Sequence, residues 1–568
     1  MHNAAMSIVV DLKQIIARAA KRAGIKLAAS DVPLEHPAEL KNGDYASGIA
    51  LQYAKQSGQA PRTIAEKIVA SFGTIEDIAK VEVAGAGFIN FYLASSALAD
   101  AVHVAINKSD LWGAVKLNKG KKIMVEYTDP NPFKEFHIGH LMSNAIGESI
   151  ARLLEFSGAE VKRANYQGDV GPHVAKAIWG IKKLGLDPHD SANLGRAYAT
   201  GAKAYEDNLS AKAEIGTINQ KIYDKSDVEI NKIYEAGRKA SLEHFEEIYK
   251  ILGTKFDDYF FESETAQRGI ELVRKHPEVF EQSDGAVVFK GEKYGLHTRV
   301  FLTSKGLPTY ETKDLGLAEL KAQTWPFDES ITVTAHEQAD YFAVVKAALG
   351  EILPEIAAKI RHISHGMMRL PSGKMSSRTG DVITGESLLN ELVDAAKERA
   401  IESRAENPEL LARQIAVGAI KYQILKQASG RDIIFDRERA LSLEGDSGPY
   451  LQYTHARAHG VIEKADSQGV SLGVQKGDSL RIPENAEALA RLIHRFPEIV
   501  EYAAREREPH LLTNYLLELA SAFNSWYAQV HILDGSSEAA SKVALTAAVR
   551  ATLKNGLWIL GIPAPEKM

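Results

Sequence analysis

The pattern of hydrophobic and polar residues divides the chain into three stretches that predict different secondary structure. Residues 1–117 combine helical periodicity with strand-like alternation around a glycine turn, which predicts a small α+β module. Residues 118–414 alternate between strand and helix patterns, and residues 415–568 are almost entirely helical, which predicts a separate bundle. In the first stretch the expected helices are 8–23, 45–56 and 62–72, and the expected strands are 80–83 and 84–93.

The start of the second stretch predicts a strand–helix–strand unit. Residues 121–128 have the apolar character of a buried strand, and the turn-forming sequence Asp129-Pro-Asn-Pro132 follows it. In 137–156 the apolar residues recur at three- and four-residue spacing, and Gly158 suits the end of that helix. Residues 160–166 then form the next expected strand. This order is typical of a βαβ unit in an α/β domain.

A charged, helical segment at about 181–256 predicts an insertion between two halves of a sheet. Strand patterns return after it, and turn residues separate them. The expected strands are 285–289, 299–302, 330–334 and 359–364.

Composition limits the function classes without selecting one. The 568 residues suffice for three or four domains, at about 150 residues each. The net charge of -6 neither indicates nor excludes a nucleic-acid partner. The lack of cysteine excludes disulfides, thiol nucleophiles and Cys-ligated zinc. The apolar run at 8–10 is too short for a signal sequence, and no stretch reaches the roughly 18 apolar residues of a membrane helix, so we expect a cytoplasmic protein.

The sharpest short motif is His137-Ile-Gly-His140, which follows an expected strand and opens an expected helix. A helix N-terminus carries free N–H groups and a positive dipole end, so it attracts phosphates. Gly139 removes a side chain where a flat ring could approach the backbone. Two histidines at a solvent-facing helix start are the plain alternative, which the strand–loop–helix context disfavours.

A second motif, Ser372-Gly-Lys-Met-Ser-Ser-Arg-Thr-Gly380, follows the last expected strand of the sheet. Its small residues and its cations Lys374 and Arg378 suit a loop that binds polyphosphate. Taken alone, the motif is explained better by an exposed basic loop.

In this order the two motifs resemble the HIGH and KMSKS signatures of class I aminoacyl-tRNA synthetases. The segment 125–140 resembles the corresponding stretch of arginyl-tRNA synthetases in particular. The resemblance covers essentially the whole length. Further family-like segments are Gly43-Asp-Tyr-Ala46 with Pro61-Arg62, 85–90, Tyr310-Glu-Thr-Lys-Asp314, 448–457 and 560–568.

The resemblance implies a fold and an activity. The fold would be α/β, with a Rossmann-like catalytic domain at 118–414, a small N-terminal domain at 1–117 that contacts tRNA, and an all-α anticodon-binding domain at 415–568. The activity would be conversion of arginine and ATP to arginyl-adenylate and pyrophosphate, followed by transfer to the 3′ end of tRNA(Arg). The family usually requires bound tRNA before it activates arginine. Magnesium is expected with ATP, without a dedicated protein ligand and without zinc, and we expect a monomer.

Adenylate formation needs positioning and stabilisation of phosphate charge, not an obligatory acid or base. Suitable groups for ATP are His137, Gly139, His140, Lys374, Met375, Ser376 and Arg378. A guanidinium substrate needs carboxylate acceptors and an aromatic face. The resemblance implies that Tyr310 packs on the substrate and that Asp314 and Glu262 accept from its guanidinium. Asp257 is the alternative to Glu262. Asn131 and Gln338 would hold the α-amino and α-carboxyl groups of the substrate. Without the resemblance, Tyr310 and Asp314 would be a surface pair one helical turn apart.

In the C-terminal stretch, Tyr450, Tyr453 and Arg457 follow one another at spacings of three and four residues, which predicts one aromatic and cationic face of a helix. Such side chains suit unstacked RNA bases. Tyrosines that bridge a helical core are the alternative. The candidates for tRNA contact are Tyr450, Tyr453, Arg457, Tyr527 and Met568, together with Phe88 and Asn90 in the N-terminal module.

One departure from the family pattern concerns charge. The second lysine of KMSKS is replaced here by Ser377. Lys134 lies three residues before His137, so its ammonium could reach the same phosphates. We hypothesise that Lys134 is a catalytic cation that supplies the missing charge, the alternative being a solvated surface lysine.

Rival functions share parts of this pattern. Glutamyl, glutaminyl and class I lysyl synthetases have the same two motifs, but a carboxylate-lined pocket disfavours glutamate and glutamine and leaves lysine open. Small nucleotidyltransferases use a similar histidine site in much shorter chains. A non-catalytic tRNA-binding relative is disfavoured by the intact His137, His140, Lys374 and Asp314.

Overall fold

The computed structural model describes residues 4–369, 371, 384–401, 403, 405–470 and 480–568. Its centre is a parallel five-stranded sheet in the order β11-β10-β4-β5-β6. Val125 and Ile331 pair in register and are fully buried, because elements cover both faces of the sheet. This confirms the α/β, Rossmann-like class. The strands are β4 (Lys122–Glu126), β5 (Glu160–Gln167), β6 (Asp258–Phe261), β10 (Glu329–Ala335) and β11 (Ile360–His365).

Helix α5 (Ile138–Phe156) connects β4 to β5 and confirms the expected βαβ unit. One of its faces lies on the sheet, and it also packs against helices of the C-terminal part. A Cβ added to Gly147 would stand 2.3 Å from the Tyr127 side chain, so this glycine lets helix and strand approach closely. The helix therefore joins the sheet to the C-terminal bundle, with its N-terminus at the end of β4.

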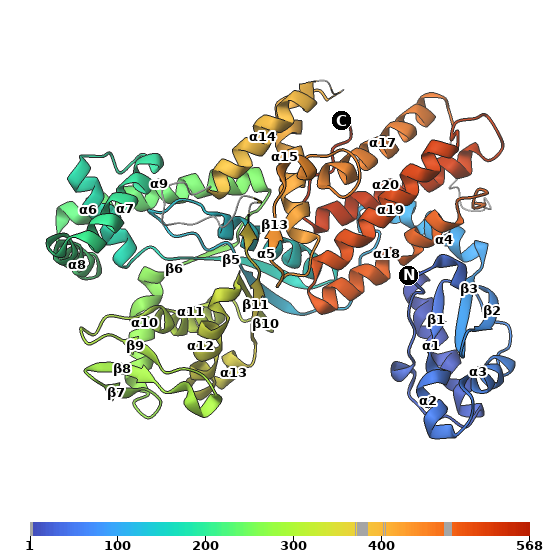
Figure 1. Ribbon diagram of the computed structural model, residues 1–568, viewed down its shortest axis with the longest axis horizontal. Helices are drawn as coiled ribbons and strands as arrows, with labels where there is room; N and C mark the ends of the chain where they lie inside the picture. Colours follow the sequence, from blue (N-terminus) through green and yellow to red (C-terminus); the bar gives the residue numbers. More distant parts are fainter. Residues whose placement is uncertain (1–3, 370, 372–383, 402, 404, 471–479) are drawn as a thin grey trace.

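The expected insertion is helical and lies between β5 and β6. Figure 1 shows its helices as a lobe at one end of the molecule. They have a hydrophobic core of their own, which includes Ile178 and Ile215. The helices are α6 (Pro172–Leu184), α7 (Ser191–Asp207), α8 (Leu209–Asp224) and α9 (Val228–Leu252).

A second lobe lies between β6 and β10. Two of the expected strand segments, 285–289 and 299–302, belong to a separate antiparallel sheet β7-β8-β9 here, while 330–334 and 359–364 belong to the central sheet. Helices α12 and α13 connect β10 to β11. The elements are α10 (Glu262–Lys275), β7 (Glu281–Ser283), β8 (Ala286–Phe289), β9 (Arg299–Leu302), α11 (Tyr310–Thr324), η5 (His336–Gln338), α12 (Ala339–Ile352) and α13 (Pro354–Ala357).

The C-terminal stretch is a helical bundle, as expected. A two-residue pairing of β12 with β13 joins it to the end of the sheet region. Helix α15 continues through residue 414, where we placed the domain boundary. The elements are β12 (Met368–Arg369), α14 (Gly385–Ile401), α15 (Pro408–Leu425), β13 (Ile433–Ile434), α16 (Arg437–Ala440), α17 (Gly448–Ser467), α18 (Glu487–Glu506), α19 (Pro509–Gln529) and α20 (Ala539–Ile559).

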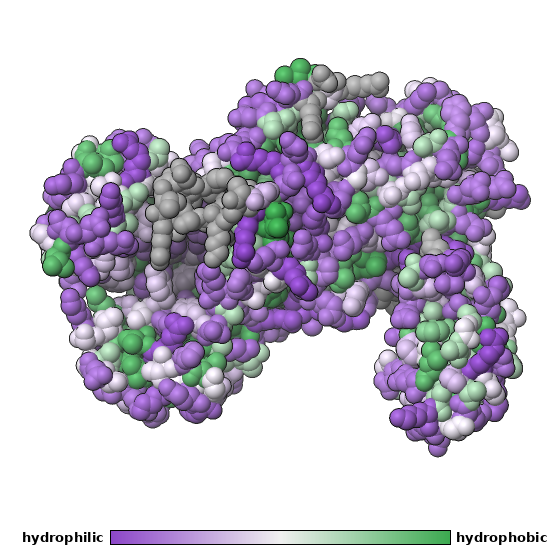
Figure 2. Space-filling view, viewed as in Figure 1, coloured by the Kyte–Doolittle hydropathy of each residue, from purple (hydrophilic) through white to green (hydrophobic). Residues whose placement is uncertain are grey.

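The N-terminal module projects from the bundle as a separate lobe whose visible surface is mostly hydrophilic (Figures 1 and 2). The expected strands at 80–93 form the hairpin β2–β3. The expected helix 45–56 was wrong at its start: residues 45–47 are a strand, because Tyr45 is buried and pairs with Phe91. The elements are α1 (Ala4–Arg22), β1 (Tyr45–Ser47), α2 (Ile49–Ser57), α3 (Pro61–Ala70), β2 (Ile78–Ala84), β3 (Phe88–Leu93) and α4 (Ser95–Lys108).

Candidate active site

A cleft of about 460 Å³ opens at the carboxyl ends of the parallel strands. Crevices at this edge of an open α/β sheet are where ligands bind. The cleft brings together residues that are far apart in the sequence. Those among the expected site residues that line it are Asn131, His137, Gly139, His140, Glu262, Tyr310, Asp314 and Gln338.

The two histidines of the first motif stack at the start of α5. His137 is the N-cap, and its backbone N–H donates to Nδ1 of His140 at 3.2 Å. Their ring centroids are 3.5 Å apart. Desolvation lowers the pKa of His137 to about 4, with Lys134 adding to the effect, and it also lowers the pKa of His140. Both rings are therefore neutral at pH 7 and can offer N–H donors to a phosphate or a purine, but not full positive charges.

Gly139 leaves room for the ring of His137 beside the helix backbone. A Cβ at this position would lie 3.0 Å from Cε1 of His137, so a side chain would push the ring away. The glycine leaves the helix N-terminus open toward the cleft.

The loop between β4 and α5 is strained. Thr128, Asp129 and Phe133 have φ of 80°, 47° and 67°, the left-handed region that non-glycine residues rarely adopt. Such residues cost about 1–3 kcal/mol each and persist only where surrounding contacts impose them. The Ser143 hydroxyl accepts from the N–H of Thr128 at 3.0 Å, and Asp129 accepts from the N–H of Tyr166 at 2.8 Å. The strain places Asn131 at the cleft wall.

Tyr310 and Asp314 lie one turn apart at the start of α11. Tyr310 is 54% exposed and borders the cleft. Oδ2 of Asp314 accepts from the hydroxyl of Tyr341 at 2.5 Å. Burial raises the pKa of Asp314 to about 8, with Glu126 and Glu262 adding to the rise and the Tyr341 hydrogen bond opposing it. An empty pocket at pH 7 therefore holds Asp314 mostly as the neutral acid.

Glu262, the first residue of α10, is the second carboxylate expected to bind the substrate, and Glu126, Asp129 and Glu337 line the same cleft. Glu262 is buried and lines the cleft, and its Oε2 accepts from Nζ of Lys313 at 2.5 Å. Asp257, the alternative, accepts from the backbone N–H of Arg163 at 2.8 Å, at the start of β6 and away from the cleft. The geometry therefore favours Glu262 as the partner of Asp314.

Several residues in or next to the cleft were not among the expected site residues. Tyr341 and Asp129 line the cleft, and Lys313 is buried against Glu262. Lys321 forms a buried ion pair at 2.7 Å with Glu126, which also lines the cleft. The sequence offered three hints: Glu126 is a charged residue at the end of a buried strand, Asp129 belongs to a turn-forming sequence, and Lys313 lies within the family-like segment 310–314.

Lys134 lies beside the cleft histidines, with its ammonium 5.1 Å from the ring centroid of Tyr198 on α7. Burial lowers its pKa, and Lys176 adds to the effect while Glu262 opposes it. Lys374, Met375, Ser376 and Arg378 lie outside the described residues. The flanking Thr384 forms a β-bridge with His137, so the chain returns to the cleft directly after that segment.

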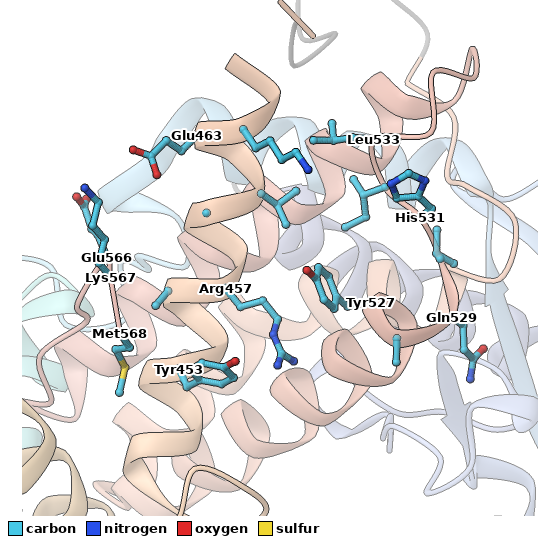
Figure 3. A pocket seen from close by; sticks show the side chains of 17 residues that line it. Tyr453, Arg457, Glu463, Tyr527, Gln529, His531, Leu533, Glu566, Lys567 and Met568 are labelled. Atoms are coloured by element: carbon cyan, nitrogen blue, oxygen red, sulfur yellow. The ribbon is translucent and has the colours of Figure 1, made fainter. Parts of the chain in front are cut away.

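A second cavity of about 1040 Å³ lies among the C-terminal helices (Figure 3). The guanidinium of Arg457 lies 4.7 Å from the ring centroid of Tyr453 and 5.1 Å from that of Tyr527. Asn524 accepts from Arg457 and donates to Thr454, which fixes the arrangement. Met568 also lines this cavity. An open aromatic–cation surface of this kind suits stacked bases.

The remaining expected tRNA residues are placed differently. Tyr450 packs against the bundle core and does not line the cavity. Asn90 is buried in β3, while Phe88 at the β2–β3 hairpin is 37% exposed. Only Phe88 of these three presents its side chain substantially to solvent.

Among the described residues, no group of three or more His, Asp and Glu side chains is arranged to hold a metal ion. In the same part of the chain, no helix is long and apolar enough to cross a membrane.

Three family models match the chain. "tRNA synthetases class I (R), catalytic domain" matches residues 102–437, "DALR anticodon binding domain" matches 451–568, and "Arginyl tRNA synthetase N terminal domain" matches 10–93. Together with the parallel sheet and the histidine motif at its carboxyl edge, the first match defines a class I aminoacyl-tRNA synthetase.

Full-length relatives identify the family within this class. The arginine–tRNA ligase of Treponema denticola is 32% identical, and the match covers 96% of this chain and 96% of the relative. The arginine–tRNA ligase of Clostridium perfringens is 31% identical, and the match covers 98% of this chain and 100% of the relative. The Thermus thermophilus arginyl-tRNA synthetase structure has a TM-score of 0.79 at 27% identity, covering 98% of this chain and 99% of its own. The chain belongs to the arginyl-tRNA synthetases, the class I enzymes that charge tRNA(Arg) with arginine.

Proposed function

We propose that the cleft joins arginine to ATP as arginyl-adenylate and then transfers arginine to the 3′ end of tRNA(Arg). The observation that supports these roles is the convergence in one cleft of a helix N-terminus with two neutral histidines and a wall that includes the ring of Tyr310 and several carboxylates, among them Asp314 and Glu262. The first suits phosphates and a purine, and the second suits a guanidinium.

ATP binds at the N-terminus of α5, with the purine over Gly139. The neutral rings of His137 and His140 donate to the phosphates, and no carboxylate of the described residues lies at ion-pair distance from them to compete. Lys374, Met375, Ser376 and Arg378 act with them from the KMSKS-like segment, and Mg²⁺ accompanies the nucleotide. Catalysis comes from oriented donors aimed at the charge that develops on the phosphates.

Arginine binds with its side chain against Tyr310. Its guanidinium donates to Asp314 and Glu262, while Asn131 and Gln338 hold the α-amino and α-carboxyl groups. This places the substrate carboxylate toward the phosphates above α5. A planar, multi-donor cation matches two separated carboxylates better than a compact ammonium does, which favours arginine over lysine.

Lys134 supplies a cation beside His137. It is close enough to depress the pKa of both histidines, and its own depressed pKa reflects a partly desolvated position. Its contact with Tyr198 directs the ammonium toward the insertion, so it must rotate to reach the phosphates.

The N-terminal module at 1–117 and the bundle at 415–568 bind tRNA, the bundle at the anticodon through Tyr453, Arg457 and Tyr527. Phe88 offers a further stacking surface in the module. The enzyme acts as a monomer in the cytoplasm.

Arginine-dependent pyrophosphate exchange should require tRNA(Arg), because the anticodon contact lies outside the catalytic domain and its binding energy can be used to order the cleft. The measurement is exchange with and without tRNA(Arg), with a non-cognate tRNA as the control. Full exchange in the absence of any tRNA would contradict this dependence.

A further inference from the structure

Lys313 is a buried cation between two residues of the proposed arginine pocket. It follows Tyr310 by three positions on α11 and directly precedes Asp314. Its side chain is 4% exposed and its Nζ donates to Oε2 of Glu262 at 2.5 Å. The same Nζ lies 5.0 Å from the ring centroid of Tyr310. It therefore contacts both a carboxylate and an aromatic ring that we assign to the substrate.

Two opposite roles are possible for such a cation. It could occupy the place of the substrate guanidinium in the empty pocket and be displaced by arginine. Alternatively, it could remain as a counter-ion behind the pocket. The first role predicts that its removal tightens arginine binding, and the second predicts that its removal weakens it.

The geometry favours the second role. Glu262 lines the cleft and Lys313 does not. Lys313 takes Oε2, whereas Oε1 faces Gly168, where an added Cβ would lie only 3.1 Å from it. A Cβ at Gly168 would also stand 2.3 Å from Oδ1 of Asn131, so Oε1 and Asn131 border the same wall. One oxygen of Glu262 thus remains for a ligand while the other is held from behind.

The charge of Lys313 also supports its role as a counter-ion of Glu262. Burial raises the pKa of Glu262, and Lys313 opposes the rise most strongly, since a cation at hydrogen-bond distance stabilises the anion. Asp169 adds to the rise, and Lys134 opposes it. Asp314, the other carboxylate assigned to the substrate, has no such cation at hydrogen-bond distance among the described residues and accepts from the hydroxyl of Tyr341. Without its counter-ion a buried carboxylate takes up a proton more readily, and the neutral acid attracts a guanidinium much less than the anion does.

We propose that Lys313 is a positioning residue that remains in place when arginine binds and keeps Glu262 ionised, so that the single free oxygen of Glu262 receives the substrate guanidinium. This inference rests on the proposed role of Glu262. Arginine therefore never has to break the Lys313–Glu262 pair.

The test uses Lys313→Met and Lys313→Arg in the full chain, assayed by arginine-dependent pyrophosphate exchange with tRNA(Arg) present. Lys313→Met should raise the KM for arginine at least tenfold at pH 7 and leave the KM for ATP within twofold, and the increase should shrink as the pH rises and Glu262 ionises. Lys313→Arg, which keeps the cation, should stay within about threefold of the parent enzyme. Unchanged ATP kinetics in the same variant establish that it is folded.

The double variant Lys313→Met with Glu262→Gln tests whether Lys313 affects arginine binding through Glu262. If Lys313 acts through Glu262, adding Lys313→Met to Glu262→Gln should change the KM for arginine less than twofold. A lower KM for arginine in Lys313→Met would overturn the proposal in favour of a displaced placeholder. An unchanged KM, or fully additive effects in the double variant, would overturn it as well.

The proposed pocket and this inference fail in different ways. If Glu262→Gln leaves the KM for arginine unchanged, Glu262 does not bind the substrate and both ideas fall. If Glu262→Gln impairs arginine use while Lys313→Met does not, the pocket stands and only the role of Lys313 is overturned. If Lys313→Met does not fold, the KM for arginine of Lys313→Arg is measured across the same pH range. Because this variant keeps the cation, the proposal predicts that its KM depends on pH as that of the parent enzyme does, and a different pH dependence would overturn the proposal.

Discussion

Replacing Asp314 by asparagine tests the chemistry of the arginine pocket most sharply, because this carboxylate titrates in an accessible range. Burial raises its pKa to about 8, and a guanidinium needs the ionised form. Arginine binding should therefore improve as the pH rises through that value, with release of a proton. The substitution Asp314→Asn keeps the shape of the side chain and removes the ionisation.

The magnitude follows from the pKa. About one tenth of the empty enzyme carries an ionised Asp314 at pH 7, which costs about 1.4 kcal/mol in apparent affinity, since one pKa unit is worth about 1.36 kcal/mol. Between pH 7 and pH 8.5 the ionised fraction rises about eightfold, so the KM for arginine should fall by about that factor. At pH 8.5, Asp314→Asn should raise the KM by about 30- to 1000-fold, the roughly 2–4 kcal/mol of a buried charged hydrogen bond.

The assay is pyrophosphate exchange at saturating ATP and tRNA(Arg) from pH 6.5 to 8.5, with the KM for ATP as the internal control. Tyr341→Phe is the matched variant: its hydroxyl lowers the pKa of Asp314, so its loss should move the inflection to higher pH. The reasoning is refuted if the KM for arginine of the parent enzyme stays constant over this range, or if Asp314→Asn changes it by less than twofold.

Three further predictions concern other parts of the molecule. Tyr453→Ala and Tyr527→Ala should each weaken tRNA binding at fixed salt by about 1–3 kcal/mol and leave the KM values for arginine and ATP unchanged; the Phe variants keep the rings and serve as controls, and unchanged binding with a lowered melting temperature would assign these tyrosines to the core. Lys134→Ala should slow single-turnover adenylation by about 10²- to 10³-fold, and Ser377→Lys in that background should restore part of the rate; a rate within threefold of the parent would make Lys134 an ordinary partly buried lysine. The buried hydroxyl of Tyr45 in the N-terminal module donates a 2.5 Å hydrogen bond to Glu498 on α18. Tyr45→Phe removes this bond and should lower the free energy of unfolding, measured by denaturant titration, by about 1–3 kcal/mol. An unchanged denaturation midpoint would show that this contact does not hold the module.

The elements with long, regular patterns could be predicted from the sequence. The spacing of Ile138, Leu141, Ala145 and Ile150 defined α5 almost to the residue, because one face of that helix is apolar over its whole length. Tyr45 could not be assigned in this way. Its strand is only three residues long, and long-range pairing with Phe91 overrides the local helical pattern that begins at Ile49.

The candidate site was predictable where a motif or a resemblance named the residue, as for His137, Tyr310 and Asp314. The buried residues that hold these side chains in place could not be predicted, because they meet through contacts between residues far apart in the sequence. Lys313 reaches Glu262 across 51 positions of sequence, and Lys321 reaches Glu126 across most of the domain. Neither pair has a spacing that periodicity or a turn pattern could reveal.

The same limit applies to the C-terminal cavity. The spacing of Tyr453 and Arg457 on α17 predicted a shared face, but Tyr527 comes from α19 and meets them only in the folded bundle. Tyr450 shares the helical spacing and packs inward instead, because the helix turns that position toward the core.

The most direct test of the central claim is transfer of labelled amino acids to purified tRNA(Arg) by the full chain with ATP and Mg²⁺. Arginine should be esterified to tRNA(Arg), and lysine, glutamate and glutamine should give no charging above background. Charging of any of these three in preference to arginine, or no charging of tRNA(Arg) with arginine by the folded protein, would contradict the assignment.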